Sequence, residues 1–91
     1  MDTGSAAVLY QIGLLHLTAS QPDEAEKAFQ DAARRDPRRT DPHIELGRIY
    51  EQRGDKGLAL EEFRQALRLD PASPAALQAV EGLAAASASG S

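Results

Sequence analysis

The strongest constraint on this chain is an internal repeat of 34 residues. When residues 6–39 are aligned with residues 40–73 without a gap, seven of the 34 positions are identical. The identical pairs are Gly13 and Gly47, Ala25 and Ala59, Phe29 and Phe63, Ala32 and Ala66, Arg34 and Arg68, Asp36 and Asp70, and Pro37 and Pro71. Unrelated segments of this length would share roughly two residues. A chain with such a period folds as a stack of similar units.

Apolar residues fall at helical spacing within each unit. Leu9, Ile12, Gly13 and His16 take the i, i+3, i+4 and i+7 places of one helix face, and the segment from Ala25 to Ala33 repeats this pattern. The pattern predicts five helices, at residues 5–18, 22–35, 41–53, 56–69 and 74–86. The predicted fold class is therefore all-α, an α-solenoid of stacked antiparallel helix pairs.

Residues suited to helix ends lie between these segments. Gly54 is placed to end a helix in the left-handed conformation, and Asp55 is placed to cap the next one. Asp41 and Ser73 each precede a proline, which suits the first position of a helix, so we expect both to be N-caps. The final residues, 87–91, are only Ser, Ala and Gly and are predicted to form a disordered tail.

Taken together, these residues resemble the tetratricopeptide repeat family, whose unit is a 34-residue helix-turn-helix. The resemblance rests on Gly13, Ala25, Phe29, Ala32 and Pro37 in the first unit and on Gly47, Tyr50, Ala59, Phe63, Ala66 and Pro71 in the second. It implies a right-handed superhelix. The expected organisation is a lead-in at 1–5, repeats at 6–39 and 40–73, a capping helix at 74–86 as a partial third repeat, and the tail.

Proteins of this family are interaction modules, and the first helices of their repeats line a concave groove. Carried onto this sequence, the expected groove residues are Tyr10, Leu14, Leu17, Ile44, Arg48 and Glu51. Family members that hold a chaperone's acidic tail carry Lys and Asn where this chain has Tyr10, Leu14 and Glu45, so that role is disfavoured. The resemblance instead implies a protein or peptide partner whose apolar side chain lies between Tyr10, Leu14 and Ile44.

The first predicted helix is apolar on nearly all sides, which favours burial of more than one face. Its second stripe of Tyr10, Leu14 and Leu17 is explained by a partner in the groove, by self-association as a homo-oligomer, by a missing neighbouring repeat, or as an exposed patch without a function. An architectural module stacking end to end is a further alternative. Its exposed ends would be Val8, Leu9 and Tyr10 at one side and Leu77, Val80 and Leu83 at the other.

The sequence contains no pattern of catalytic chemistry. There is no Cys, no phosphate-binding loop and no pair of facing carboxylates, and the family role of His16 and His43 is packing between helices. We therefore predict no enzyme, no cofactor, no metal site and no small-molecule substrate. The Arg34–Arg39 loop carries four basic residues but no aromatic residue, so contact with an anion or nucleic acid is a second, weaker alternative.

Composition and charge give less information about where in the cell the protein is located. The net charge is −4, and the apolar run from Ala6 to Leu17 is too short to span a bilayer and lacks the features of a signal peptide. We expect no membrane insertion and, by default, a cytoplasmic protein. A periplasmic or envelope-associated site is expected if the chain is a fragment of a longer one. Eight of the ten basic residues are Arg, which favours a bacterial source.

Overall fold

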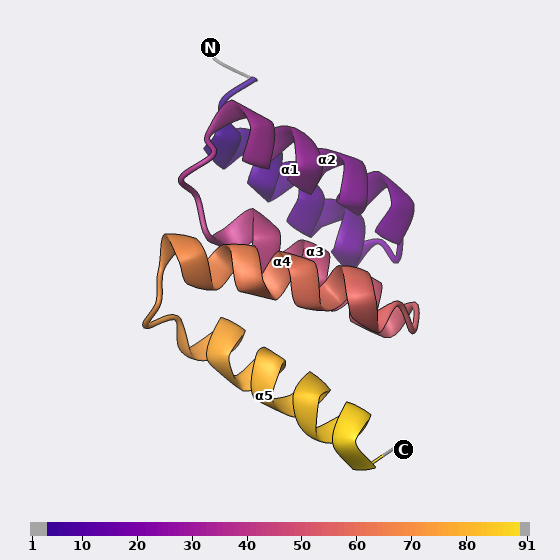
Figure 1. The fold of residues 1–91 in the computed structure, drawn as a ribbon. Helices are drawn as coiled ribbons and strands as arrows, with labels where there is room; N and C mark the ends of the chain where they lie inside the picture. Colours follow the sequence, from indigo (N-terminus) through magenta and orange to yellow (C-terminus); the bar gives the residue numbers. More distant parts are fainter. Residues whose placement is uncertain (1–3, 90–91) are drawn as a thin grey trace.

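A computed structural model describes residues 4–89, which form five α-helices (Figure 1). Their bounds are α1 Ala6–Thr18, α2 Pro22–Arg35, α3 Asp41–Gln52, α4 Lys56–Leu69 and α5 Pro74–Ser89. Each helix packs mainly against the helices next to it in the chain, so that the pairs α1/α2 and α3/α4 and then α5 form a stack. The all-α helical-repeat fold and the five predicted helices are confirmed.

In each helix pair, one phenylalanine of the second helix packs against one glycine of the first helix. Phe29 and Phe63 are almost completely buried, at 0% and 1% exposed. A Cβ atom added to Gly13 would lie 2.5 Å from Cε1 of Phe29, and one added to Gly47 would lie 2.6 Å from Cζ of Phe63. The glycines therefore allow the close approach of the two helices, and the rings fill the space between them, as the repeat predicts.

Most of the predicted helix ends are confirmed. Gly54 has a φ of 82°, and the Asp55 side chain accepts a hydrogen bond from the Leu58 backbone N–H at 3.3 Å. The Ser73 hydroxyl accepts one from the Ala76 backbone N–H at 3.4 Å. These side chains satisfy N–H groups that the first turn of a helix leaves without a partner.

Two predictions about helix ends were wrong. Asp41 is the first residue of α3 rather than its cap, and Thr40 before it makes no capping bond through its side chain. The Asp41 carboxylate instead accepts two hydrogen bonds from the Arg39 guanidinium, at 3.2 and 2.7 Å. At the other end, α5 continues to Ser89, three residues past the predicted end. Residues 84–89 are Ala and Ser, and alanine favours helix most strongly, so 87–89 extend the helix; residues 90–91 lie outside the described part.

The turn after α1 offers a stabilising substitution. Ser20 has a φ of 59°, in the left-handed region, and occupies the same place in the first repeat as Gly54 in the second. Because a side chain makes this conformation costly, we expect Ser20→Gly to raise the free energy of unfolding by about 1 kcal/mol. For a domain of this size, Tm then rises by roughly 4–8 °C in a thermal melt. The reciprocal Gly54→Ser should lower Tm, and a lower Tm for Ser20→Gly would contradict the prediction.

Candidate functional site

The six predicted groove residues divide between two helices and two environments. Tyr10, Leu14 and Leu17 on α1 and Ile44 on α3 are half-buried and pack against the central hydrophobic cluster. The remaining two, Arg48 and Glu51 on α3, are exposed. The stripe of Tyr10, Leu14 and Leu17 therefore has less free apolar surface than its sequence pattern suggests, and the charged residues next to Ile44 are the ones open to solvent.

Glu45 links the two helices of this surface, which sequence reasoning missed. Its Oε2 accepts a hydrogen bond from the Tyr10 hydroxyl at 3.2 Å, and its Oε1 lies 3.5 Å from Nη1 of Arg48. The Arg39 guanidinium lies 5.7 Å from the centroid of the Tyr10 ring, within cation–π distance. Tyr10 is thus held by a carboxylate on α3 and by a cation from the loop between the repeats.

A second polar cluster joins α2 to the end of α3. The Tyr50 hydroxyl donates to Oε2 of Glu26 at 2.7 Å, and Arg53 pairs with Glu26 at 2.6 Å and with Asp23. Burial of the Glu26 carboxyl alone would raise its pKa, but the hydrogen bonds from Arg53 and Tyr50 outweigh this effect and hold the pKa below its usual range. This cluster connects the two repeats and is a structural contact.

Both tyrosines of the chain are affected by burial next to a carboxylate. Burial and then Glu45 raise the pKa of Tyr10 to about 12, and burial and then the hydrogen bond to Glu26 raise that of Tyr50 to about 12. The ordinary value is 10.0. Each hydroxyl therefore stays protonated as a donor throughout the physiological range.

These shifts predict alkaline destabilisation with a direct spectroscopic readout. The folded state holds the two protons more tightly than the unfolded chain, so stability is complete below pH 10 and falls as pH rises towards 12. Because the chain has two Tyr and no Trp, tyrosinate absorbance reports on them alone. We expect a titration near pH 12 in native buffer and near pH 10 in denaturant. Superimposable curves would contradict the prediction.

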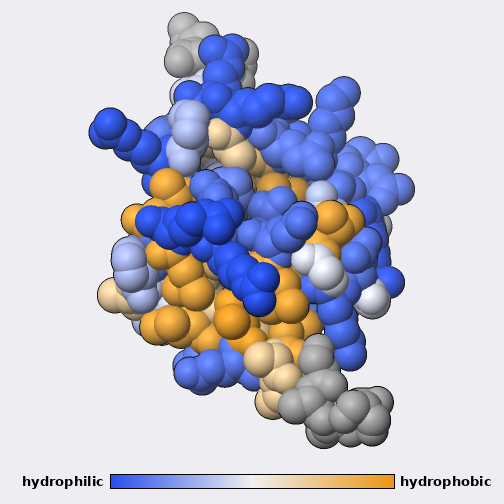
Figure 2. Space-filling view, viewed as in Figure 1, coloured by the Kyte–Doolittle hydropathy of each residue, from blue (hydrophilic) through white to orange (hydrophobic). Residues whose placement is uncertain are grey.

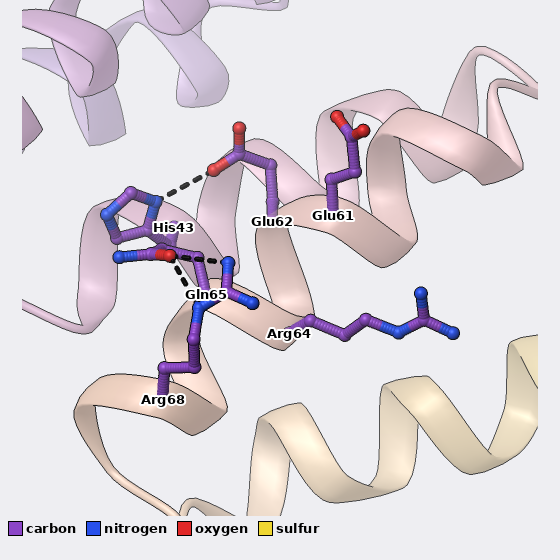
Figure 3. A pocket seen from close by; sticks show the side chains of 6 residues that line it. All are labelled: His43, Glu61, Glu62, Arg64, Gln65 and Arg68. Atoms are coloured by element: carbon purple, nitrogen blue, oxygen red, sulfur yellow. Dashed lines mark hydrogen bonds and ion pairs between the residues drawn. The ribbon is translucent and has the colours of Figure 1, made fainter.

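A hollow of about 440 Å³ is lined by none of the predicted groove residues (Figure 3). Its lining comes from α3 and α4: His43, Glu61, Glu62, Arg64, Gln65 and Arg68. Nδ1 of His43 lies 2.8 Å from Oε1 of Glu62, and Arg68 donates to the side chain of Gln65. The lining contains both acidic and basic side chains, and some of them already pair with one another. The hollow is therefore not a binding site with a single sign of charge.

The remaining predicted candidates also have partners within the chain. His43 is half-buried as expected, and His16 is half-buried with its Nδ1 2.9 Å from the Gln21 side chain. The predicted Arg34–Arg39 loop is only partly a loop, because Arg34 and Arg35 are the last two residues of α2; in this segment Arg34 pairs with Asp31 and Arg39 with Asp41. Among the described residues 4–89, the other two arginines of this segment, Arg35 and Arg38, have no carboxylate within ion-pair distance.

Two kinds of feature are absent from the described residues. Within residues 4–89, none of the helices combines the length and apolar character needed to cross a bilayer. In the same part of the chain, no group of three or more His, Cys, Asp or Glu side chains is arranged to hold a metal ion.

Comparison with known proteins gives a family and a fold. A family model described as "Tetratricopeptide repeat" matches residues 10–74. Two solved structures, titled "Crystal structure of MamA" and "Crystal structure of MamA protein", match with TM-scores of 0.87 and 0.84, each at 24% identity. They cover 98% and 90% of this chain but 51% and 45% of their own, so the chain spans about half the length of these structures. No curated protein matches it.

Proposed function

Because the chain belongs to the tetratricopeptide repeat family, we propose that it is a non-catalytic scaffold that binds a peptide or helix of a partner protein on the surface formed by α1 and α3. Tetratricopeptide repeats generally mediate protein–protein interactions, and the family is typically non-catalytic. In this proposal residues 6–39 and 40–73 are the two repeats, and α5 closes the second.

The observation that carries the proposal is the exposed Arg48 beside half-buried apolar side chains. The Arg48 side chain is 55% exposed, and its nearest carboxylate, on Glu45, is 3.5 Å away and already accepts a bond from Tyr10. Arg48 bonds Glu45 only through Nη1 and at 3.5 Å, so its other N–H groups can pair with an acidic group of a ligand whose apolar side chain rests against Leu14 and Ile44. The expected ligand is a segment that carries an apolar residue close to an acidic one.

Selection from a displayed peptide library against the 91-residue protein tests this ligand class. We expect selected peptides to share an apolar residue near Asp or Glu, and we expect Arg48→Glu to weaken their binding about tenfold, or ~1.4 kcal/mol. Arg48 is a better test than Leu14, because Leu14 packs against the core and its substitution would also destabilise the fold.

The matched control is Arg64→Glu, since Arg64 is also an exposed arginine but lies on α4 and lines the hollow of Figure 3. Binding measured by fluorescence anisotropy should change less than twofold in this variant, a difference of about 0.4 kcal/mol. The opposite result would overturn the proposal. If Arg64→Glu weakened peptide binding and Arg48→Glu did not, the binding surface would lie on α4.

A further inference from the structure

Each helix pair meets the next helix of the stack at a junction, and the two junctions are built from different side chains. The first junction is the contact of α2 with α3, and the second junction is the contact of α4 with α5. At the first junction, three polar residues of α2 bond to Tyr50 or Arg53 of α3. They are Asp23, Glu26 and Gln30, and the residues 34 positions later on α4 are Gly57, Leu60 and Arg64.

The second junction is apolar. Leu60 of α4 packs against the hydrophobic cluster that includes Leu83 of α5, and Leu83 is 3% exposed. Figure 2 shows apolar side chains gathered over α4 and α5. The prediction that Leu83 is exposed at the end of the stack was therefore wrong. Burial of apolar surface holds this junction, and such burial does not depend on charge.

The first junction has less apolar surface on the side of α2. The buried residues of α2 are three alanines and Phe29, and the Phe29 ring lies against Gly13 of α1. An alanine side chain buries one methyl group, so these residues supply less apolar contact than a leucine in the same place does on α4. The polar contacts therefore carry a larger share of the first junction than of the second.

Glu26 is at the centre of these polar contacts. Its Oε1 accepts a hydrogen bond from Arg53 at 2.6 Å, and its Oε2 accepts one from the Tyr50 hydroxyl at 2.7 Å. The Glu26 side chain is 22% exposed, whereas that of Asp23, the other carboxylate bonded to Arg53, is 87% exposed. Solvent therefore screens the bonds of Glu26 less than it screens the Asp23 pair.

The bonds of Glu26 lie at the open end of the first junction. The loop 36–40 ties the end of α2 to the start of α3. Glu26 is near the start of α2, and Tyr50 and Arg53 are near the end of α3, so their bonds close the end opposite the loop. Loss of these bonds releases that end while the loop still holds the other, which is the geometry of a hinge.

The other titratable groups of these helices do not replace Glu26. Arg53 is the only cation that bonds to Glu26 in the described part of the chain, so protonation of Glu26 leaves Arg53 with the exposed Asp23 alone. The remaining groups are Lys27, which follows Glu26 on α2, Glu62 on α4, whose charge acts on Tyr50, and Tyr10 and His16 on α1, which bond to Glu45 and Gln21.

We propose that Glu26 is an acid-sensitive latch between the two helix pairs: when its carboxylate takes up a proton, the first junction opens at the loop 36–40 while both pairs stay folded. A neutral carboxyl does not attract the Arg53 guanidinium, and it is a weaker acceptor for the Tyr50 hydroxyl. The second junction and the interior of each pair, where a phenylalanine packs against a glycine, are held by apolar contacts instead. Proton uptake at Glu26 therefore acts on one junction.

The direction of the pH dependence follows from the Glu26 carboxyl. Burial alone would raise its pKa, but the bonds from Arg53 and Tyr50 hold the pKa below its usual value of 4.5. The latch is therefore fully formed above pH 4.5 and is lost as the pH falls below that value. Opening changes the spacing between α1 and α3, which belong to different pairs. That consequence for peptide binding rests on the proposed function, whereas the latch itself does not.

Distances between two spin labels test the latch in the free protein, without a peptide. The chain has no Cys and two lysines, so Lys27→Cys and Lys56→Cys place one label on α2 and one on α4, both at exposed positions. At neutral pH we expect a narrow distance distribution by pulsed electron spin resonance. Below pH 4.5 the distribution should broaden towards longer distances while the helical circular dichroism signal stays unchanged. Glu26→Gln should show the broad distribution already at neutral pH.

The matched control is Glu62→Gln, the same change at a glutamate that is 24% exposed and bonds to His43 inside the second pair. Its distribution should be as narrow as that of the wild type at neutral pH. Three results would overturn the proposal: a narrow distribution for Glu26→Gln, equal broadening by Glu26→Gln and Glu62→Gln, or broadening that occurs only together with loss of the helical signal. The last result would mean that the junction does not open apart from the pairs.

Discussion

Phe63→Ala is expected to destabilise the fold by about 3–5 kcal/mol, the cost of removing a large buried ring. Phe63 is 1% exposed and fills the space between α4 and Gly47 of α3. Because a domain this small has a total stability near the low end of 5–15 kcal/mol, the variant should be partly unfolded at room temperature. Urea denaturation followed by helical circular dichroism measures the loss.

The control for Phe63→Ala is Leu77→Ala, which removes an apolar side chain that is 41% exposed. Its cost should stay below about 1 kcal/mol, because a partly exposed side chain leaves no cavity. A loss for Phe63→Ala as small as that for Leu77→Ala would mean that the ring does not carry the packing of the second repeat.

Gly47→Ala is expected to destabilise the protein by about 2 kcal/mol, the central value for overpacking a well-filled core. The added Cβ would lie 2.6, 2.7 and 2.8 Å from three atoms of the Phe63 ring, which is 1% exposed, so either this buried ring or the α3 backbone has to shift. Alanine normally stabilises a helix relative to glycine by about 1 kcal/mol, so the steric clash has to exceed that gain.

Gly82→Ala is the matched control, because it makes the same substitution inside α5, where nothing in the described part of the chain besides the helix's own backbone lies within 4 Å of the added Cβ. It should stabilise the protein by up to about 1 kcal/mol, so the two variants are expected to differ in sign. Adding Phe63→Leu to Gly47→Ala should cost less than the sum of the single changes, since the smaller side chain makes room for the methyl group. Stabilisation by Gly47→Ala would contradict the close-packing argument.

The helices and their order were predictable because the signals are local. Hydrophobic spacing, the Gly54 turn and the Asp55 cap all act within about five residues, and the 34-residue period applies them twice. The pairing of each Phe with a Gly also followed from the repeat. Two predictions failed where two local arrangements have similar energies. The Asp41 carboxylate pairs with Arg39 instead of capping α3. Residues 87–89 extend α5 instead of forming a disordered tail.

The surface was less predictable because it depends on contacts between distant residues. Tyr10 meets Glu45 across 35 positions, and Tyr50 meets Glu26 across 24. Spacing along one helix cannot reveal such pairs, because each side chain is in an ordinary place on its own helix. The only signal was the polar group on each tyrosine, which needs a partner once the ring is buried.

By itself, the sequence determined a stack of helix pairs, since its period, its helix ends and its Gly and Phe positions all agree on one fold. It did not determine which face of α1 is covered, because that helix is apolar on nearly all sides and its pattern favours no single face. Only the tertiary structure decided this, by packing Tyr10, Leu14 and Leu17 against the core and leaving Val8 and Leu15 exposed. The physical reason is that burial depends on which helices lie next to α1 in space, and those helices come from elsewhere in the chain.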